Sequence, residues 1–109
     1  MLELYQTEWC PASRRVRERL TELGLDYLIH QVPVEREARA TLAAATGSET
    51  IPTLLVGGET PIVGEEAIER YLDRRFVEPP EAQAQRAKAA RARRRYLEQE
   101  CECLQPATH

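Results

Sequence analysis

The sequence has no long apolar run, few aromatic residues and no excess of basic residues. Its 109 residues include one tryptophan, one phenylalanine and four tyrosines. No apolar segment approaches the roughly 20 residues that span a bilayer, and the N-terminus lacks a basic stretch followed by an apolar one, so we expect neither a membrane protein nor a signal peptide. With 15 basic against 18 acidic residues, the chain is unlike a nucleic-acid-binding protein. These absences favour a cytoplasmic protein.

Cysteine is also scarce, and its number is odd. The three cysteines are Cys10, Cys101 and Cys103. A disulfide-stapled secreted domain normally carries an even, well-spread set, whereas a reducing cytosol suits free or reactive thiols. Because 42% of the residues are hydrophobic and 30% are charged, the chain can bury one modest core.

The composition divides the chain into two parts. Acidic residues outnumber basic ones before Pro80, and the reverse holds after it. The pair Pro79-Pro80 cannot continue a helix. We therefore expect a compact domain over 1–77, followed by a linker, a C-terminal helix and a tail over 78–109.

Apolar periodicity and turn residues predict the elements of the compact domain. They are a strand over 2–6, a helix over 11–24, a buried strand over 25–32, a helix over 35–45, a hairpin of strands 53–56 and 60–63, and a helix over 65–76. A parallel strand pair joined by a helix and extended by a hairpin forms a mixed four-stranded sheet. Helices on both faces make this a three-layer α/β domain.

Cys10 lies where the first strand gives way to a helix that begins with Pro11. Unpaired N–H groups and the helix dipole, about half a positive charge, favour a thiolate there. Arg14 and Arg15 add positive potential if either side chain folds back. Such a site lowers a thiol pKa and makes the sulfur a nucleophile; the alternative is an inert, buried cysteine.

Two further segments are candidate ligand sites. If the Ile51–Pro52 bond is cis, the Ile51 backbone offers its N–H and C=O to an extended ligand; the alternative is an ordinary trans proline. After Gly64, the carboxylates of Glu65 and Glu66 could hold an amine while helix N–H groups hold a carboxylate. The alternative is an acidic helix start that only stabilises the helix.

Three segments resemble those of glutaredoxins, in the same order and with similar spacing. Residues 4–15 (LYQTEWCPASRR) resemble the active-site segment, residues 50–53 (TIPT) the cis-proline segment, and residues 64–68 (GEEAI) the acidic clamp for a γ-glutamyl group. The last segment looks equally like the N-terminal domain of glutathione S-transferases. The resemblance covers about 76 residues and implies a thioredoxin-like fold.

The resemblance also implies roles for particular residues. Ser13 stands where many glutaredoxins have a second cysteine, so only a monothiol route through Cys10 is open, with Ser13 donating a hydrogen bond to the Cys10 sulfur. Ile51 and Pro52 would present the docking edge, and Glu65 and Glu66 the far clamp. The implied function is a thiol–disulfide oxidoreductase for glutathionylated or disulfide-bearing proteins. Glutathione or another low-molecular-weight thiol is its co-substrate, and no metal is expected.

Two alternative functions remain open. One is a reduced glutathione S-transferase that conjugates a thiol to an electrophile, although the chain holds only one helix of the helical domain that such an enzyme uses. The other is a non-catalytic thioredoxin-fold interaction module. Thr7 leaves this non-catalytic alternative open, because many glutaredoxins have at that position a lysine that helps to bind glutathione.

The C-terminal part fits no glutaredoxin core. Strong helix formers predict a helix over 82–99, which either packs back on the sheet domain or joins two copies as a homodimer. Beyond it, Cys101, Cys103 and His109 are too few for a tetrahedral metal site. A frayed tail is the simpler interpretation.

Overall fold

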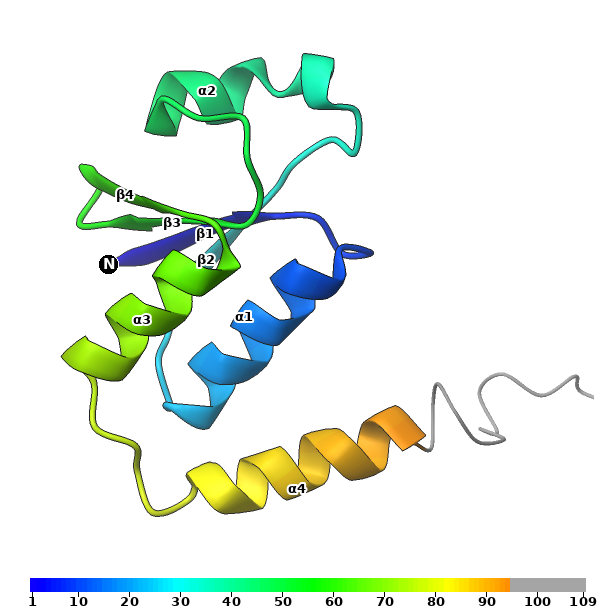
Figure 1. Cartoon of the computed structure of the whole chain (residues 1–109), viewed down its shortest axis with the longest axis vertical. Helices are drawn as coiled ribbons and strands as arrows, with labels where there is room; N and C mark the ends of the chain where they lie inside the picture. Colours follow the sequence, from blue (N-terminus) through cyan, green and yellow to red (C-terminus); the bar gives the residue numbers. More distant parts are fainter. Residues whose placement is uncertain (95–109) are drawn as a thin grey trace, which may run out of the picture.

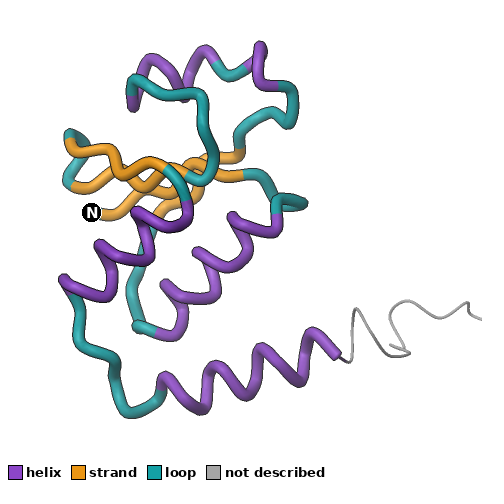
Figure 2. Tube along the Cα trace, viewed as in Figure 1, coloured by secondary structure: helices purple, strands orange, loops and turns teal. Residues whose placement is uncertain are grey.

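The computed structural model describes residues 1–94 and contains a four-stranded mixed sheet between two layers of helices (Figures 1 and 2). In chain order the elements are β1 (Leu2–Gln6), α1 (Pro11–Glu22), β2 (Leu28–Gln31), the 3₁₀ turn η1 (Arg36–Ala38), α2 (Ala40–Thr46), β3 (Thr53–Val56), β4 (Thr60–Val63), α3 (Glu65–Arg75) and α4 (Ala82–Arg93). The predicted order of strands and helices, and with it the thioredoxin-like α/β fold, is confirmed.

The strand order is β2-β1-β3-β4. β1 pairs in parallel with β2, and β3 pairs antiparallel with both β1 and β4. β1, β2 and β4 therefore end at the same edge of the sheet, where β3 begins. The loops at this edge follow Gln6, Gln31 and Val63 and precede Thr53.

Two apolar clusters hold the layers together, one on each face of the sheet. Leu4 and Leu54 pack with α1 and α3 residues in the larger cluster, which consists of Leu4, Val16, Leu20, Leu23, Leu54, Ile68 and Leu72. Tyr5 and Leu55 pack with Leu42 of α2 and with Val32 on the other face. Neighbouring strand residues thus face opposite layers, as the pleat requires. Each fully buried aliphatic side chain contributes about 1.5–3 kcal/mol.

The second strand is shorter and more exposed than predicted. Instead of a buried strand over 25–32, β2 covers four residues at the edge of the sheet, where Leu28 and Ile29 are exposed. Leu25 and Tyr27 precede the strand and pack against the larger core cluster from a loop. The apolar run over 25–32 therefore contains two parts: loop residues that pack against the core and a short edge strand.

The helix predicted over 35–45 is also broken, at Arg39. η1 ends at Ala38, and α2 begins only at Ala40. The largely buried Arg39 guanidinium donates hydrogen bonds to three backbone carbonyls, those of Pro33, Val34 and Glu49, at 3.0, 2.8 and 2.7 Å. These contacts hold the loops on both sides of α2 and account for the interruption.

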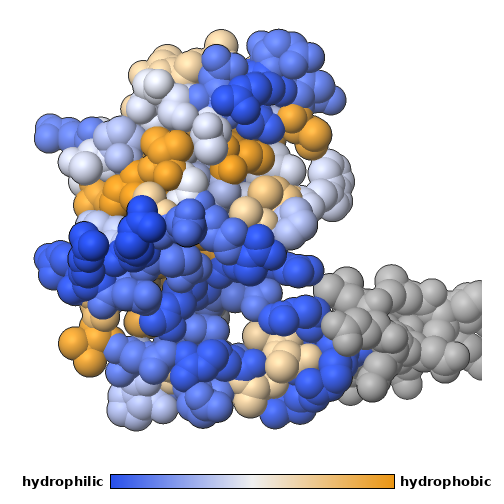
Figure 3. All heavy atoms as spheres, viewed as in Figure 1, coloured by the Kyte–Doolittle hydropathy of each residue, from blue (hydrophilic) through white to orange (hydrophobic). Residues whose placement is uncertain are grey.

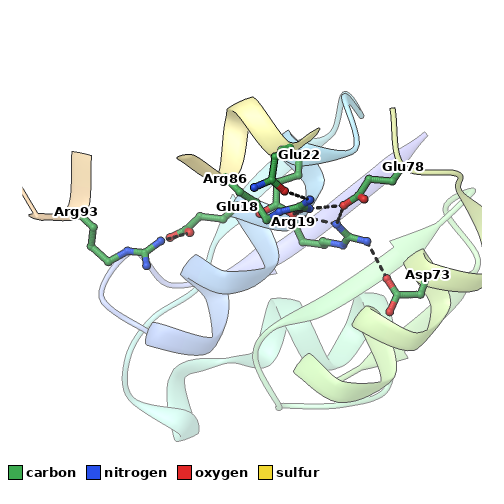
Figure 4. A network of polar contacts seen from close by, with 8 residues as sticks. Glu18, Arg19, Glu22, Asp73, Glu78, Arg86 and Arg93 are labelled. Carbon is green, nitrogen blue, oxygen red and sulfur yellow. Dashed lines mark hydrogen bonds and ion pairs between the residues drawn. The ribbon is translucent and has the colours of Figure 1, made fainter. Parts of the chain in front are cut away.

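α4 lies against α1 of the same chain through charged side chains (Figure 4). Arg19 of α1 binds Glu22 at 2.9 Å and both Asp73 and Glu78 at 3.0 Å. Arg86 of α4 binds Glu78 and lies 3.4 Å from Glu22. At the far end of α4, Arg93 binds Glu18 at 2.6 Å. We call these seven residues the charge clasp.

The clasp confirms the first of the two arrangements expected for the C-terminal helix. Of the α4 residues, only Ala82 is buried, so apolar packing contributes little to docking. Pairing between copies stays a prediction, as does the domain division at residue 77. The part of the predicted helix after Arg94, together with Cys101, Cys103 and His109, lies outside the described residues.

The visible surface differs between the two helical layers (Figure 3). In this view, hydrophilic side chains cover α1 and α3, while apolar side chains gather around α2 and the adjoining sheet. None of the helices within residues 1–94 combines the length and apolar character needed to cross a membrane.

Candidate functional site

Cys10 caps the N-terminus of α1. Its backbone is extended, with φ −77° and ψ 119°, and Pro11 occupies the first helical position. The Ser13 backbone N–H donates to Cys10 Sγ at 3.4 Å, while the Arg14 N–H donates to the Cys10 carbonyl at 3.0 Å. The thiol is partly exposed. The prediction that Cys10 lies at the N-terminus of a helix is therefore confirmed.

The surroundings of Cys10 favour its thiolate. Partial burial raises the thiol pKa, but this effect is outweighed by hydrogen bonds from the Ser13 side chain and from the Ser13 and Ala12 backbones, together with the positive charge of Arg15. The net result is a Cys10 pKa below its ordinary value. A thiolate held in this way can attack a disulfide or an electrophilic carbon.

Ser13 joins the thiol to the preceding turn. Its side chain is fully buried, and its hydroxyl oxygen accepts a hydrogen bond from the Thr7 N–H at 3.4 Å. The Ser13 side chain is also one of the groups that lower the pKa of the Cys10 thiol. Ser13 thus lies in the place where a supporting group for Cys10 was predicted.

The Ile51–Pro52 peptide bond is cis, which is the first of the two alternatives left open by the sequence. Pro52 is buried, and Ile51 is partly buried. Because Tyr5 pairs with Thr53, Pro52 lies at the edge of the sheet where β1 ends. The Gly64 N–H donates to the Pro52 carbonyl at 2.9 Å, so the proline loop and the start of α3 are directly joined.

Glu65 and Glu66 open α3 after Gly64, whose φ of +90° suits glycine. The Glu65 carboxylate is bound by Arg15, whose Nη2 donates to Oε1 at 2.9 Å and whose Nε donates to Oε2. Arg15 holds the pKa of Glu65 below its usual range through this hydrogen bond and its charge. Any ligand amine at Glu65 must share the carboxylate with Arg15, whereas Glu66 is exposed.

The link between Cys10 and Glu65 through Arg15 was not predicted. The sequence analysis left open whether Arg14 or Arg15 turns toward the thiol. In the structure, Arg15 is the one whose charge acts on Cys10, while Arg14 lies 3.6 Å from Glu18. Arg15 and Glu65 are separated by 50 positions in the sequence, so no local pattern could have identified the pair.

Thr7 and Trp9 flank the site in different ways. Thr7 is buried, and its hydroxyl donates to the Val32 carbonyl. Trp9 is 81% exposed, so its indole does not pack against α1. Within residues 1–94, no three His, Cys, Asp or Glu side chains form a group that could hold a metal ion.

Comparison with known proteins agrees with this geometry. Residues 4–80 match the family described as the N-terminal domain of glutathione S-transferase. A glutaredoxin of Pseudomonas aeruginosa (strain PAO1) is 36% identical over 61 residues, which are 56% of this chain and 71% of the relative.

Solved structures of glutaredoxins and of glutathione S-transferases share the fold. The buckwheat glutaredoxin–glutathione complex matches with a TM-score of 0.55 and 26% identity, covering 79% of each chain. A glutathione S-transferase from Rhodospirillum rubrum F11 matches with a TM-score of 0.60 and 28% identity, covering 86% of this chain but 43% of the transferase. The chain therefore belongs to the thioredoxin-fold family that comprises glutaredoxins and the N-terminal domains of glutathione S-transferases.

Proposed function

We propose that this chain is a monothiol glutaredoxin-like thiol–disulfide oxidoreductase. The observation that carries the proposal is Cys10 at the N-terminus of α1, with its pKa lowered by Ser13 and Arg15 and with the Ile51–Pro52 segment at the same edge of the sheet. The similarity to glutaredoxins supports it. Its substrates would be glutathionylated or disulfide-bearing proteins of the cytoplasm.

The proposed reaction has two exchange steps. The Cys10 thiolate attacks the glutathione sulfur of a mixed disulfide; a Cys10–glutathione disulfide forms, and the protein cysteine leaves as a thiolate that takes up a proton. The thiolate of a second glutathione then attacks the glutathione sulfur on Cys10. Oxidised glutathione leaves, and the Cys10 thiolate is restored. The protein cysteine is thereby reduced to the thiol, and the second glutathione is oxidised as it joins the transferred glutathionyl unit in a disulfide.

The proposed thiol ligand lies along the proline loop. The Ile51 backbone would pair with its peptide groups beside buried Pro52. Its γ-glutamyl amine would meet the carboxylates of Glu65 and Glu66, while N–H groups at the start of α3 face its carboxylate. The complex of the related buckwheat glutaredoxin with glutathione supports glutathione as this thiol.

Turnover of a glutathionylated peptide in the presence of glutathione tests the proposal, with formation of oxidised glutathione as the readout. Cys10→Ser should reduce turnover to the uncatalysed rate, because no sulfur remains to accept the glutathionyl group. The double variant Cys101→Ser/Cys103→Ser is the matched control and should keep wild-type turnover. Equal activity of wild type and Cys10→Ser would contradict the proposal.

A second candidate is a glutathione S-transferase activity, which the match over residues 4–80 favours. In that reaction the chain would activate the glutathione sulfur to attack an electrophilic carbon. Conjugation of an aryl halide, with no turnover of the glutathionylated peptide, would select this alternative. An inactive chain whose Cys10 titrates as an ordinary thiol would indicate an interaction module.

A further inference from the structure

β2 is the outermost strand on one side of the sheet, with no strand beyond it in the part of the chain that the structure describes. The Val32 N–H donates to the Gln6 carbonyl at 2.8 Å, and Gln6 pairs with Gln31 in the parallel ladder. Alternate residues of a strand direct their backbone groups to the same side. His30 therefore faces β1 as Val32 does, whereas the N–H and C=O groups of Ile29 and Gln31 point away from the sheet.

β2 lacks the proline and the charged side chains that natural proteins place on the outer strands of a sheet to prevent further pairing. Its four residues are leucine, isoleucine, histidine and glutamine. Leu28 and Ile29 are 51% and 47% exposed. The outer side of β2 thus combines outward backbone donors and acceptors with exposed apolar side chains.

The outermost strand on the other side of the sheet is protected. β4 contains Pro61, which lies opposite Leu55 of β3 and has no N–H to donate. Proline in an outer strand directs its backbone nitrogen away from the sheet, so an added strand would meet the proline ring. A further strand can therefore pair at β2 but not at β4. Pairing of copies ends at two, because a filament needs two open strands on each molecule.

We propose that two copies of this chain pair through antiparallel β2 strands across a twofold axis and form one continuous sheet. The outward backbone groups decide the register. Ile29 lies opposite the partner's Gln31, and Gln31 lies opposite the partner's Ile29, with two backbone hydrogen bonds exchanged in each pair. His30 then lies opposite the partner's His30 on the axis.

A second copy fits this strand because the register is self-complementary. Leu28, exposed in the single chain, lies opposite the partner's Val32, which is also apolar. The His30 ring stacks on Tyr5, with ring centroids 4.3 Å apart and an interplanar angle of 14°, so pairing at the axis brings two such stacks next to each other. Because β2 carries no lysine, arginine or carboxylate, no like charges of the two strands oppose each other.

The pairing leaves both proposed active sites free. β1 and β2 run in parallel toward the loops that carry Cys10. Because the two β2 strands are antiparallel, the thiols of the two copies lie at opposite ends of the joined sheet. The inference therefore goes beyond the proposed function and does not depend on it.

Sedimentation velocity at protein concentrations from about 1 μM to about 1 mM tests the pairing. Because β2 has only four residues, we expect a weak dimer, with a mass that rises with concentration toward twice that of the monomer. Ile29→Pro removes an outward N–H and should stay monomeric. Ile29→Thr keeps this N–H and is the matched control, whose dimerisation constant should remain within about fivefold of wild type.

The proline variant should keep the fold, because the Ile29 N–H does not bond to β1. Its far-UV circular dichroism and its rate of Cys10 alkylation should equal those of wild type. A dimer that persists in Ile29→Pro would place the interface on another surface, such as α4, and would overturn the proposal.

Disulfide cross-linking tests the register in a protein whose three cysteines are replaced by serine. His30→Cys places two thiols opposite each other on the axis, with Cα atoms about 4.5 Å apart, within the range of a disulfide. Oxidation should give a covalent dimer. Leu28→Cys is the matched control, because its two thiols lie four positions out of register, about 13 Å apart, and should cross-link at least about tenfold more slowly.

Equal cross-linking of the two cysteine variants would contradict the register and overturn the proposal. A mass that stays at the monomer value up to about 1 mM would overturn it as well, and would leave β2 to an extended peptide of another protein. The proposed oxidoreductase activity is read from turnover and fails or stands separately from these results.

Discussion

The sulfur of Cys10 is held by groups from its own helix and by one arginine. Ser13 and Ala12 are local contributors, because the first turn of a helix directs its N–H groups at the capping residue. Arg15 is the contributor that also reaches another element, through Glu65 of α3. Hydrogen bonds near the thiol and one more distant charge thus act in the same direction on the thiol pKa.

Replacing Arg15 with glutamine should raise the Cys10 pKa, because a positive charge that favours the thiolate is lost. At pH 7 the rate of alkylation of Cys10 should fall by about two- to fivefold, the size expected for one exposed charge. Arg14→Gln is the matched control, since Arg14 pairs with Glu18 and is not among the groups that lower the Cys10 pKa. Identical rates for Arg15→Gln and wild type would show that the charge of Arg15 does not act on the thiol.

At the scale of the element, α4 differs from α1 and α3 in what holds it. The inner helices bury leucine, valine and isoleucine in the larger core cluster, whereas α4 depends on the charge clasp. Exposed ion pairs are screened by salt, and each contributes little alone. α4 should therefore detach under conditions that leave the sheet domain folded.

Raising the salt concentration to about 1 M, where the Debye length falls to about 3 Å, should increase amide hydrogen exchange in α4 before exchange increases in α1 or α3. Arg86→Gln should have the same effect at low salt, because Arg86 of α4 binds Glu78 and lies 3.4 Å from Glu22. Arg70→Gln, at an exposed α3 position outside the clasp, serves as the control. Simultaneous exchange of all three helices would contradict separate detachment.

Lowering the pH should also weaken the charge clasp. Hydrogen bonds from Arg86 and Arg19 lower the pKa of Glu78. Because the pKa of Glu78 is lower in the folded protein than in the unfolded chain, its carboxylate stabilises the docking of α4 at pH values above the unfolded-state pKa of about 4.3. This stabilisation is lost as the pH falls through the lower folded value. The same exchange experiment should therefore show α4 released below about pH 4.

At the scale of the whole molecule, topology explains why the site forms. Loops that lie far apart in the sequence reach one edge of the sheet because β1, β2 and β4 run in the same direction and β3 runs against them. This edge carries Cys10, the cis proline and the acidic start of α3. The fold is thus sufficient to bring together the three segments on which the proposed function depends.

Local patterns predicted much of this arrangement. The capping position of Cys10 follows from a strand that meets Pro11, and the hairpin follows from Gly57-Gly58. Features that depend on distant contacts were missed: the break at Arg39, which binds carbonyls on both sides of α2, and the Arg15–Glu65 pair. β2 was mistaken for a buried strand because its apolar residues do not reveal that it lies at the edge of the sheet.

The most direct test of the account is the rate of alkylation of Cys10 as a function of pH, measured in the Cys101→Ser/Cys103→Ser protein, where Cys10 is the sole thiol. The rate should rise with pH as the thiolate forms, with a midpoint clearly below the ordinary cysteine value of about 8.5. A midpoint at or above that value would contradict the claim that the helix N-terminus, Ser13 and Arg15 hold Cys10 as a reactive thiolate.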